Sequence, residues 1–241
     1  MINTLCIETS GPHCSLALAV DGHIYCRDEL LQRTHNQYLL PLLDELFSEA
    51  GITPMQLELV SFGCGPGSFT GVRIAAAAAQ AIATASGAKV APLSSGWVLA
   101  ATAFSEHPEL QQVICFIASR GQAFYSSAYR RVNDAATDTF AYEQFEEDAL
   151  VDQPPAWLLS QEHGAGIKGR TAIAGKLPAW LPEVLQDQAL DLLYPHATVM
   201  IAEAQARHLA GESVAAQYGL PQYFAGDSPW RKSHEPGEAT G

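Results

Sequence analysis

One run of the sequence concentrates the residues best suited to holding a phosphate group. Glycines alternate with small and hydroxyl residues from Gly63 to Arg73, and an alanine-rich helix is expected to follow at once. Glycine-rich backbone offers free N–H groups, and the start of a helix adds a partial positive charge. The run lacks the Lys-Ser/Thr pair that closes a Walker A loop. Proline stands two residues before Ser68, where a nucleophile elbow needs glycine. The run is therefore either a ligand loop or a tight structural turn, and its candidate residues are Gly65, Gly67, Ser68, Thr70, Gly71 and Arg73.

A second group of polar residues ends the first predicted strand, residues 5–8. Glu8, Thr9 and Ser10 supply one carboxylate and two hydroxyls, which could lie near a phosphate or a metal ion. A strand end followed by a hydroxyl-rich turn explains the same residues without a ligand, and we prefer that explanation.

Histidine and cysteine spacing gives no metal-binding motif, so a metal site would have to be assembled from residues distant in the sequence. The eight histidines never occur as H-x-x-H, H-x-x-x-H or H-E-x-x-H, and the five cysteines never form C-x-x-C. Nothing places a serine, a histidine and an acid together for nucleophilic catalysis. We expect the cysteines to be reduced thiols in the core of a cytoplasmic protein; they are Cys6, Cys14, Cys26, Cys64 and Cys115.

The helix after the glycine run, residues 72–85, consists mostly of alanine. Side chains this small let a helix pack closely on its own sheet with one face and on another chain with the other. The alternative is that the helix is buried on all sides within one chain.

The elements that must position these residues follow a recognisable order. Asp21-Gly22 indicates a hairpin. Thr34 and Gln37 indicate a capping box at the start of a helix, and Gly51 indicates the end of that helix. The predicted elements are, in chain order, three strands, a helix, a strand, a helix, a strand and a helix. This is the order of a ribonuclease-H-like fold, which is half of the actin, sugar kinase and Hsp70 architecture. The predicted strands are 5–8, 14–20, 24–30, 57–62 and 89–93, and the predicted helices are 34–51, 72–85 and 97–104, the last capped by Ser95.

The second half of the chain begins again with strands, at 113–118 and 123–130, followed by a strand at 171–174 and a helix at 198–209. A second, reduced copy of the same α/β unit is the simplest explanation. We therefore predict two ribonuclease-H-like lobes. The first covers residues 1–103 together with the C-terminal segment 213–232, the second covers 104–212, and 233–241 is a flexible tail.

Composition narrows the classes of function. The chain has 241 residues, is 48% hydrophobic and carries a formal net charge of −13. A surface this acidic repels nucleic-acid backbones, so extensive direct binding of tRNA or DNA is disfavoured. Neither a signal peptide nor a membrane-spanning segment is expected.

Several motifs together resemble the TsaB (YeaZ) family. The family signature G-x-G-P-G-S-F-T-G-[LV]-R-I is matched from Gly63 to Ile74. The family's first two strands correspond to residues 7–10 and 14–18, and its L-L-P follows at residues 39–41. A late P-x-Y-[LF] matches residues 221–224, and an aromatic-basic tail follows at residues 230–232. The match is densest over residues 1–130.

The resemblance implies a non-catalytic subunit of the machinery that makes threonylcarbamoyladenosine in tRNAs reading ANN codons. The catalytic subunit would be the related protein TsaD, which carries a metal-binding H-x-x-x-H, and the ATPase TsaE would join the assembly. The chain would pair with itself when alone, would contact tRNA only indirectly, and would need no cofactor, although the resemblance leaves room for ATP at a subunit junction. Pairing would use the first two helices, and the expected interface residues are Leu39, Leu43, Val72, Ala75, Ala78, Ala79 and Ile82.

Four departures from the family pattern bear on this expectation. Glu8 stands where aspartate is usual, Ala118 and Ala225 replace an aspartate and an arginine, and alanines from Ala75 replace glycines. The missing acid and arginine argue against productive nucleotide or metal binding. Two rival functions are a small-molecule kinase or ATPase of the same superfamily, and a glycoprotease-like peptidase. Magnesium-dependent ATP binding by the isolated chain, or cleavage of a defined protein, would distinguish them.

Overall fold

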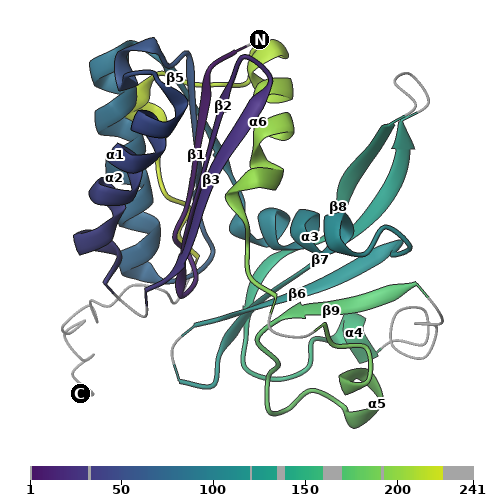
Figure 1. Ribbon diagram of the computed structural model, residues 1–241. Helices are drawn as coiled ribbons and strands as arrows, with labels where there is room; N and C mark the ends of the chain where they lie inside the picture. The colour runs from purple at the N-terminus through teal and green to yellow at the C-terminus, as the bar shows by residue number, and fades with distance from the viewer. Residues whose placement is uncertain are drawn as a thin grey trace, which may run out of the picture.

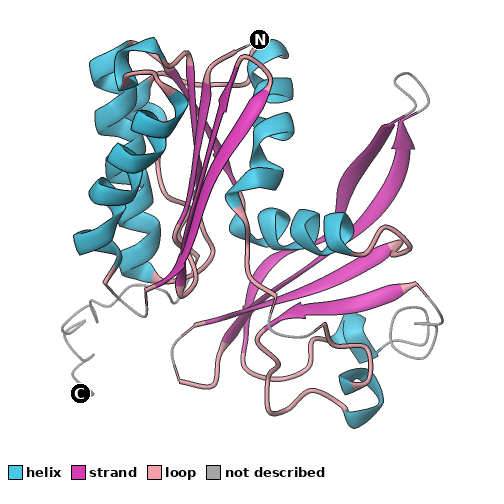
Figure 2. Cartoon of the chain, viewed as in Figure 1, coloured by secondary structure: helices cyan, strands magenta, loops and turns pink. Residues whose placement is uncertain are grey.

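The computed structural model describes residues 2–31, 34–119, 121–134, 139–159, 170–190 and 193–224. The chain is a mixed α/β protein with two sheets, each flanked by helices (Figures 1 and 2). No helix among the described residues is long and apolar enough to span a membrane.

Sheet A has the strand order β3-β2-β1-β4-β5. The first three strands form an antiparallel meander, and β4 and β5 add to it in parallel with β1. The predicted hairpin is confirmed, because Asp21 and Gly22 have φ angles of 49° and 85° in the two-residue loop between β2 and β3. The strands are β1 Thr4–Glu8, β2 His13–Val20, β3 His23–Leu30, β4 Leu59–Gly63 and β5 Lys89–Leu93.

Helices cover both faces of sheet A. Helices α1 (His35–Ala50) and α2 (Phe69–Ser86) lie side by side on one face, and α6 (Met200–Leu209) lies on the other (Figure 1). The alternation of a strand divides its side chains between these layers. Leu5 and Ile7 belong to the core beneath α1 and α2, whereas Cys6 packs with the residues of α6.

Sheet B repeats the first four strand positions of sheet A. Its order is β8-β7-β6-β9, with β6 antiparallel to β7 and parallel to β9, as β1 is to β2 and β4. Helix α3 (Ser95–Glu106) packs on one face, and the short helices α4 (Ala156–Leu159) and α5 (Glu183–Gln186) contribute to the core on the other. The strands are β6 Gln112–Ala118, β7 Phe124–Asp134, β8 Thr139–Val151 and β9 Thr171–Gly175. Single turns of 3-10 helix lie at Pro54–Gln56, Ala197–Val199 and Ala216–Tyr218.

The predicted boundary between residues 103 and 104 is corrected by these contacts, since it falls inside α3. Helix α3 packs on sheet B, and α6, which the prediction placed with the second half, packs on sheet A. The chain therefore passes to sheet B at Ser94 and returns to sheet A close to Ala197.

Three local predictions are also corrected. The Thr34 side chain does not cap α1, because its hydroxyl donates to the carbonyl of Leu31 at 2.5 Å. The cap of α3 is Ser94 rather than Ser95, since Ser94 Oγ accepts from the backbone of Gly96 and Trp97. Cys26 is exposed on β3, while the other four cysteines are buried as predicted.

Candidate functional site

The glycine loop between β4 and α2 packs against the chain's own turn between β1 and β2. Ser68 N donates to Ser10 O at 2.7 Å, and Thr9 Oγ1 donates to Gly71 O at 2.8 Å. A Cβ atom on Gly71 would collide with the carbonyl of Thr9, and one on Gly67 would lie 2.6 Å from Ser10. The close approach that these glycines allow is therefore an approach to the chain itself.

Several donors of the predicted phosphate cradle are already occupied. Cys64 N donates to Leu93 O at 2.8 Å, and Gly71 N donates to Ser68 Oγ at 3.2 Å. Ser68 thus caps α2, which starts at Phe69, three residues earlier than predicted. The loop was predicted to be either a ligand loop or a tight structural turn, and the geometry favours the tight structural turn.

Glu8 is buried directly beneath this loop. Its Oε1 accepts from Ser10 N at 2.6 Å and its Oε2 accepts from Ser95 Oγ at 3.0 Å. A Cβ on Gly63 would collide with the Glu8 carboxyl, so any other residue there would have to displace this acid. Burial raises the pKa of Glu8, which favours the neutral acid and disfavours cation binding. Among the described residues, no three histidine, cysteine or acidic side chains are grouped so that they could hold a metal ion.

Five of the seven predicted interface residues are buried within the chain, and their side chains are therefore not available to a partner. Ala78 and Ile82 are partly buried against the core beneath α1 and α2. The buried members of the predicted set are Leu39, Leu43, Val72, Ala75 and Ala79.

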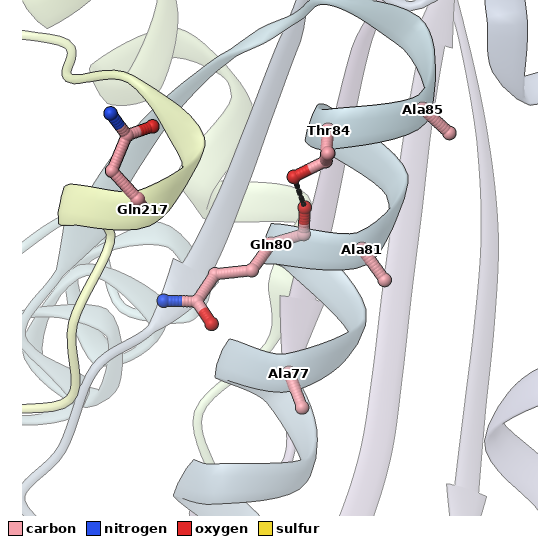
Figure 3. A pocket seen from close by; sticks show the side chains of 6 residues that line it. All are labelled: Ala77, Gln80, Ala81, Thr84, Ala85 and Gln217. Atoms are coloured by element: carbon pink, nitrogen blue, oxygen red, sulfur yellow. Dashed lines mark hydrogen bonds between the residues drawn. The ribbon is translucent and has the colours of Figure 1, made fainter.

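A different set of alanines on α2 faces outward. Ala77, Ala81 and Ala85 recur every four residues, offset by two from the buried series, and line one side of a hollow of about 690 Å³ (Figure 3). Gln80 and Thr84 lie along the same helix, and Gln217 closes the hollow from the C-terminal segment. The repeat of alanine every four residues along α2 was visible in the sequence. The repeat alone does not say which set of alanines packs on the sheet.

The C-terminal segment 214–224 runs along this side of sheet A and α2. Val214 and Val90 exchange backbone hydrogen bonds of 2.8 and 2.9 Å, and Gln80 Nε2 donates to Gly219 O at 2.9 Å. The segment leaves three large apolar side chains more than half exposed, which are Tyr218, Leu220 and Tyr223.

Arg73 joins the segment to the start of α2. Its guanidinium carbon lies 3.5 Å from the centre of the Phe69 ring, and its Nε donates to Tyr223 Oη at 3.0 Å. This cation–π contact holds aromatic rings at the surface beside the alanine face. We call the exposed alanines of α2 together with Tyr218, Leu220 and Tyr223 the α2 face.

The sequence matches known proteins along most of its length. A family described as TsaD, tRNA N6-adenosine threonylcarbamoyltransferase, matches residues 28–224. The TsaB protein of Haemophilus influenzae, a tRNA threonylcarbamoyladenosine biosynthesis protein, is 28% identical over 96% of this chain and 97% of its own length. The TsaB protein of Escherichia coli is 26% identical over 95% of this chain and 96% of its own length.

The fold matches a solved structure as well. YeaZ from Pseudomonas aeruginosa superposes with a TM-score of 0.74 at 27% identity, covering 93% of this chain and all of that one. Similarity of sequence and of fold thus extends through both sheets.

Proposed function

This chain belongs to the TsaD family of tRNA N6-adenosine threonylcarbamoyltransferases, and within it to the TsaB (YeaZ) proteins. From that membership we propose that it serves tRNA threonylcarbamoyladenosine biosynthesis as a non-catalytic subunit, which binds the catalytic subunit TsaD, cooperates with the ATPase TsaE and works in the cytoplasm. When alone, the chain would pair with a second copy of itself.

The observation that carries the proposal is the α2 face. Helices with exposed small side chains let a partner helix approach closely, and exposed aromatic residues are enriched among those that contribute most to binding. The proposed contact is therefore with the outer alanines, Ala77, Ala81 and Ala85, and with Tyr218 and Tyr223.

Two features of the chain support a role without chemistry. Its histidines lack the H-x-x-x-H spacing that the resemblance assigns to the catalytic subunit. The backbone donors of Cys64, Ser68 and Gly71 in the glycine loop are used within the chain, which argues against a phosphate-transferring site of the kinase type.

We also infer that each sheet with its helices is a ribonuclease-H-like lobe, the second one reduced. Sheet B has the strand order of the first four strands of sheet A, with the same parallel and antiparallel neighbours. On this division α6 and the segment 214–224 belong to the first lobe and α3 to the second.

The test is a single charge on the α2 face. Ala81→Glu would place an unpaired carboxylate against the partner, so co-purification with the catalytic subunit should weaken about tenfold or more. Formation of threonylcarbamoyladenosine by the reconstituted subunits with tRNA should fall with it. Ala81 suits this purpose better than Ala78, which packs partly on the core.

The matched control is Ala202→Glu, an exposed alanine on α6 at the opposite face of sheet A. Both variants should melt like the unmodified chain, and only Ala81→Glu should lose the partner. Retention of the complex at full yield by Ala81→Glu would contradict the proposal.

A further inference from the structure

The last residues that the structure describes, 222–224, lie between the α2 face and sheet B. Gln222 N donates to Cys64 O at 2.8 Å, which places the segment on the glycine loop. Gly65 has a φ of 102°, and a Cβ there would lie 3.2 Å from Gln222 O. Gly65 O in turn accepts from Ser95 N at 2.8 Å, at the start of α3. The loop thus contacts both this segment and the helix that packs on sheet B.

Two adjacent aromatic residues of the segment contact different parts of the fold. Tyr223 lies at the start of α2, where its hydroxyl accepts from Arg73 and its ring centre is 6.4 Å from that of Phe69. The Phe224 ring contacts sheet B, with its centre 5.4 Å from that of the Tyr125 ring. Tyr125 is 2% exposed and lies on β7, which pairs with β6 on one side and β8 on the other. One step along the chain therefore separates a residue of the α2 face from a residue packed on sheet B.

This geometry makes the two aromatic contacts depend on each other. Adjacent Cα atoms are about 3.8 Å apart, so Tyr223 cannot shift far without pulling Phe224 off the Tyr125 ring. Residues 219–224 form neither helix nor strand, and segments of this kind are among those that open most readily. Tyr223 is 54% exposed, so the side chain that holds the segment on α2 is also one that a partner could cover.

We propose that residues 222–224 form a strap that couples the α2 face to sheet B. Order at Tyr223 keeps Phe224 packed on Tyr125, and loss of order at Tyr223 loosens sheet B. A partner that covers Tyr223 holds the strap in place. Because coupling between two sites is reciprocal, a loosened sheet B weakens the binding of that partner. The effect on the partner rests on the function proposed above, whereas the strap itself does not.

The first test needs only the full chain. Tyr223→Ala removes the contacts with α2 and should speed hydrogen exchange at the amides of β7 near Tyr125 by about threefold or more. The matched control is Tyr218→Ala, which removes another exposed tyrosine of the same segment and should leave exchange in β7 unchanged. Equal exchange in β7 for Tyr223→Ala and the unmodified chain would overturn the strap, and so would equal acceleration by the two variants.

The second test adds the catalytic subunit TsaD. Its binding should slow exchange in β7 as well as in α2. In Phe224→Ala the slowing in β7 should disappear while the slowing in α2 remains, and the affinity for TsaD should fall about fivefold. Slowing in β7 that persists in Phe224→Ala would overturn the coupling, because the partner would then act on sheet B without the strap.

A buried residue gives an independent check, since the partner cannot touch it. Tyr125→Leu removes the ring beneath Phe224 and should weaken binding of TsaD about as much as Phe224→Ala does, whereas Tyr125→Phe should not. Thermal melts establish that the Tyr125 variants fold. Unweakened binding by folded Tyr125→Leu would contradict the coupling.

Failure of the strap and failure of the proposed function give different results. If TsaD does not bind the unmodified chain, the function proposed above fails. The comparison of Tyr223→Ala with Tyr218→Ala in the free chain then still decides whether the strap exists.

Discussion

A single buried carboxyl explains much of the glycine loop. Glu8 occupies the space that a side chain at position 63 would need, and it accepts hydrogen bonds from Ser10 and Ser95. The acid that looked like a metal or phosphate ligand in the sequence therefore ties β1 to the start of α3. Its raised pKa is the cost of taking a carboxylate out of water.

This burial predicts how Glu8→Gln changes stability. A raised pKa means that the stabilising contribution is fully present below the ordinary glutamate pKa and is lost as the pH rises through the folded value. Glutamine keeps the shape of the neutral acid and never ionises. The melting temperature of Glu8→Gln should therefore exceed that of the unmodified chain once the pH is above the folded pKa of Glu8, by at least about 2 °C.

Thermal melts at several pH values measure this difference, and Glu212→Gln at an exposed site is the control. A Glu8→Gln variant that is less stable than the unmodified chain at pH 8 would show that the ionised carboxylate, rather than the neutral acid, is the form the fold requires.

At the scale of elements, the two serines that cap helices make different numbers of hydrogen bonds. Ser68 caps α2 through Gly71 N alone. Ser94 caps α3 through Gly96 N and Trp97 N, and its hydroxyl also donates to Asp148 Oδ2 at 2.9 Å. Burial raises the pKa of Asp148, so the loss of that donor would leave a poorly solvated acid.

Alanine substitution of the two capping serines should therefore lower the free energy of unfolding by different amounts. Ser68→Ala should lower the free energy of unfolding by about 1 kcal/mol, as loss of a cap commonly does. Ser94→Ala should lower it by about 2–3 kcal/mol, because the buried Asp148 loses its donor as well. Urea denaturation of both variants gives the comparison, and equal losses would mean that Asp148 adds nothing to the cap.

These elements also show how far the sequence could be read. Asp21-Gly22 and Gly51 obey local rules, and the structure has a hairpin and a helix end there. Ser94 caps α3 through Gly96 N and Trp97 N, whereas Ser95 Oγ donates to Glu8 Oε2, a contact across 87 residues that local rules do not contain. Strand β8 was missed because its run of glutamates hides the alternation of a strand.

The sequence predicted which helix forms the candidate site, but it did not predict which residues of that helix are exposed. The family motif located α2 correctly, but helical spacing identifies residues that share a face without saying what that face meets. Leu39 and Ala75 therefore proved to be core residues, and the outward series at Ala77 and Ala81 was identified only once the sheet was in place.

For the whole molecule, the question is what fixes one sheet relative to the other. The return from sheet B to sheet A passes residues 193–197, which are anchored at three points. The Tyr194 ring packs on His13 with centres 4.5 Å apart, His196 Nδ1 lies 2.7 Å from Asp28 Oδ2, and Ala197 N donates to Ser15 Oγ at 2.9 Å. The His196–Asp28 pair is the charged part of this anchor.

The pair should loosen as the pH rises. The hydrogen bond with Asp28 raises the pKa of His196. Burial would raise the pKa of Asp28, but its hydrogen bonds to His196 and His13 outweigh burial and lower it. The contribution of His196 to stability is lost as the pH rises through the folded pKa of His196. The contribution of Asp28 to stability is lost as the pH falls through the folded pKa of Asp28. The link is therefore strongest between the ordinary values of about 3.9 and 6.5.

His196→Gln should accordingly destabilise the chain more at pH 6 than at pH 9. Hydrogen exchange in residues 193–197 should speed up several-fold at pH 6, after correction for intrinsic exchange, and thermal melts should show the same pH dependence. Since both side chains are about one-third exposed, at 35% and 27%, the effect on melting should stay within a few degrees. His23→Gln, at an exposed position on β3, is the control and should change neither measurement. Equal protection of residues 193–197 in the variant and the unmodified chain at pH 6 would assign the anchor to Tyr194 and Ala197 instead.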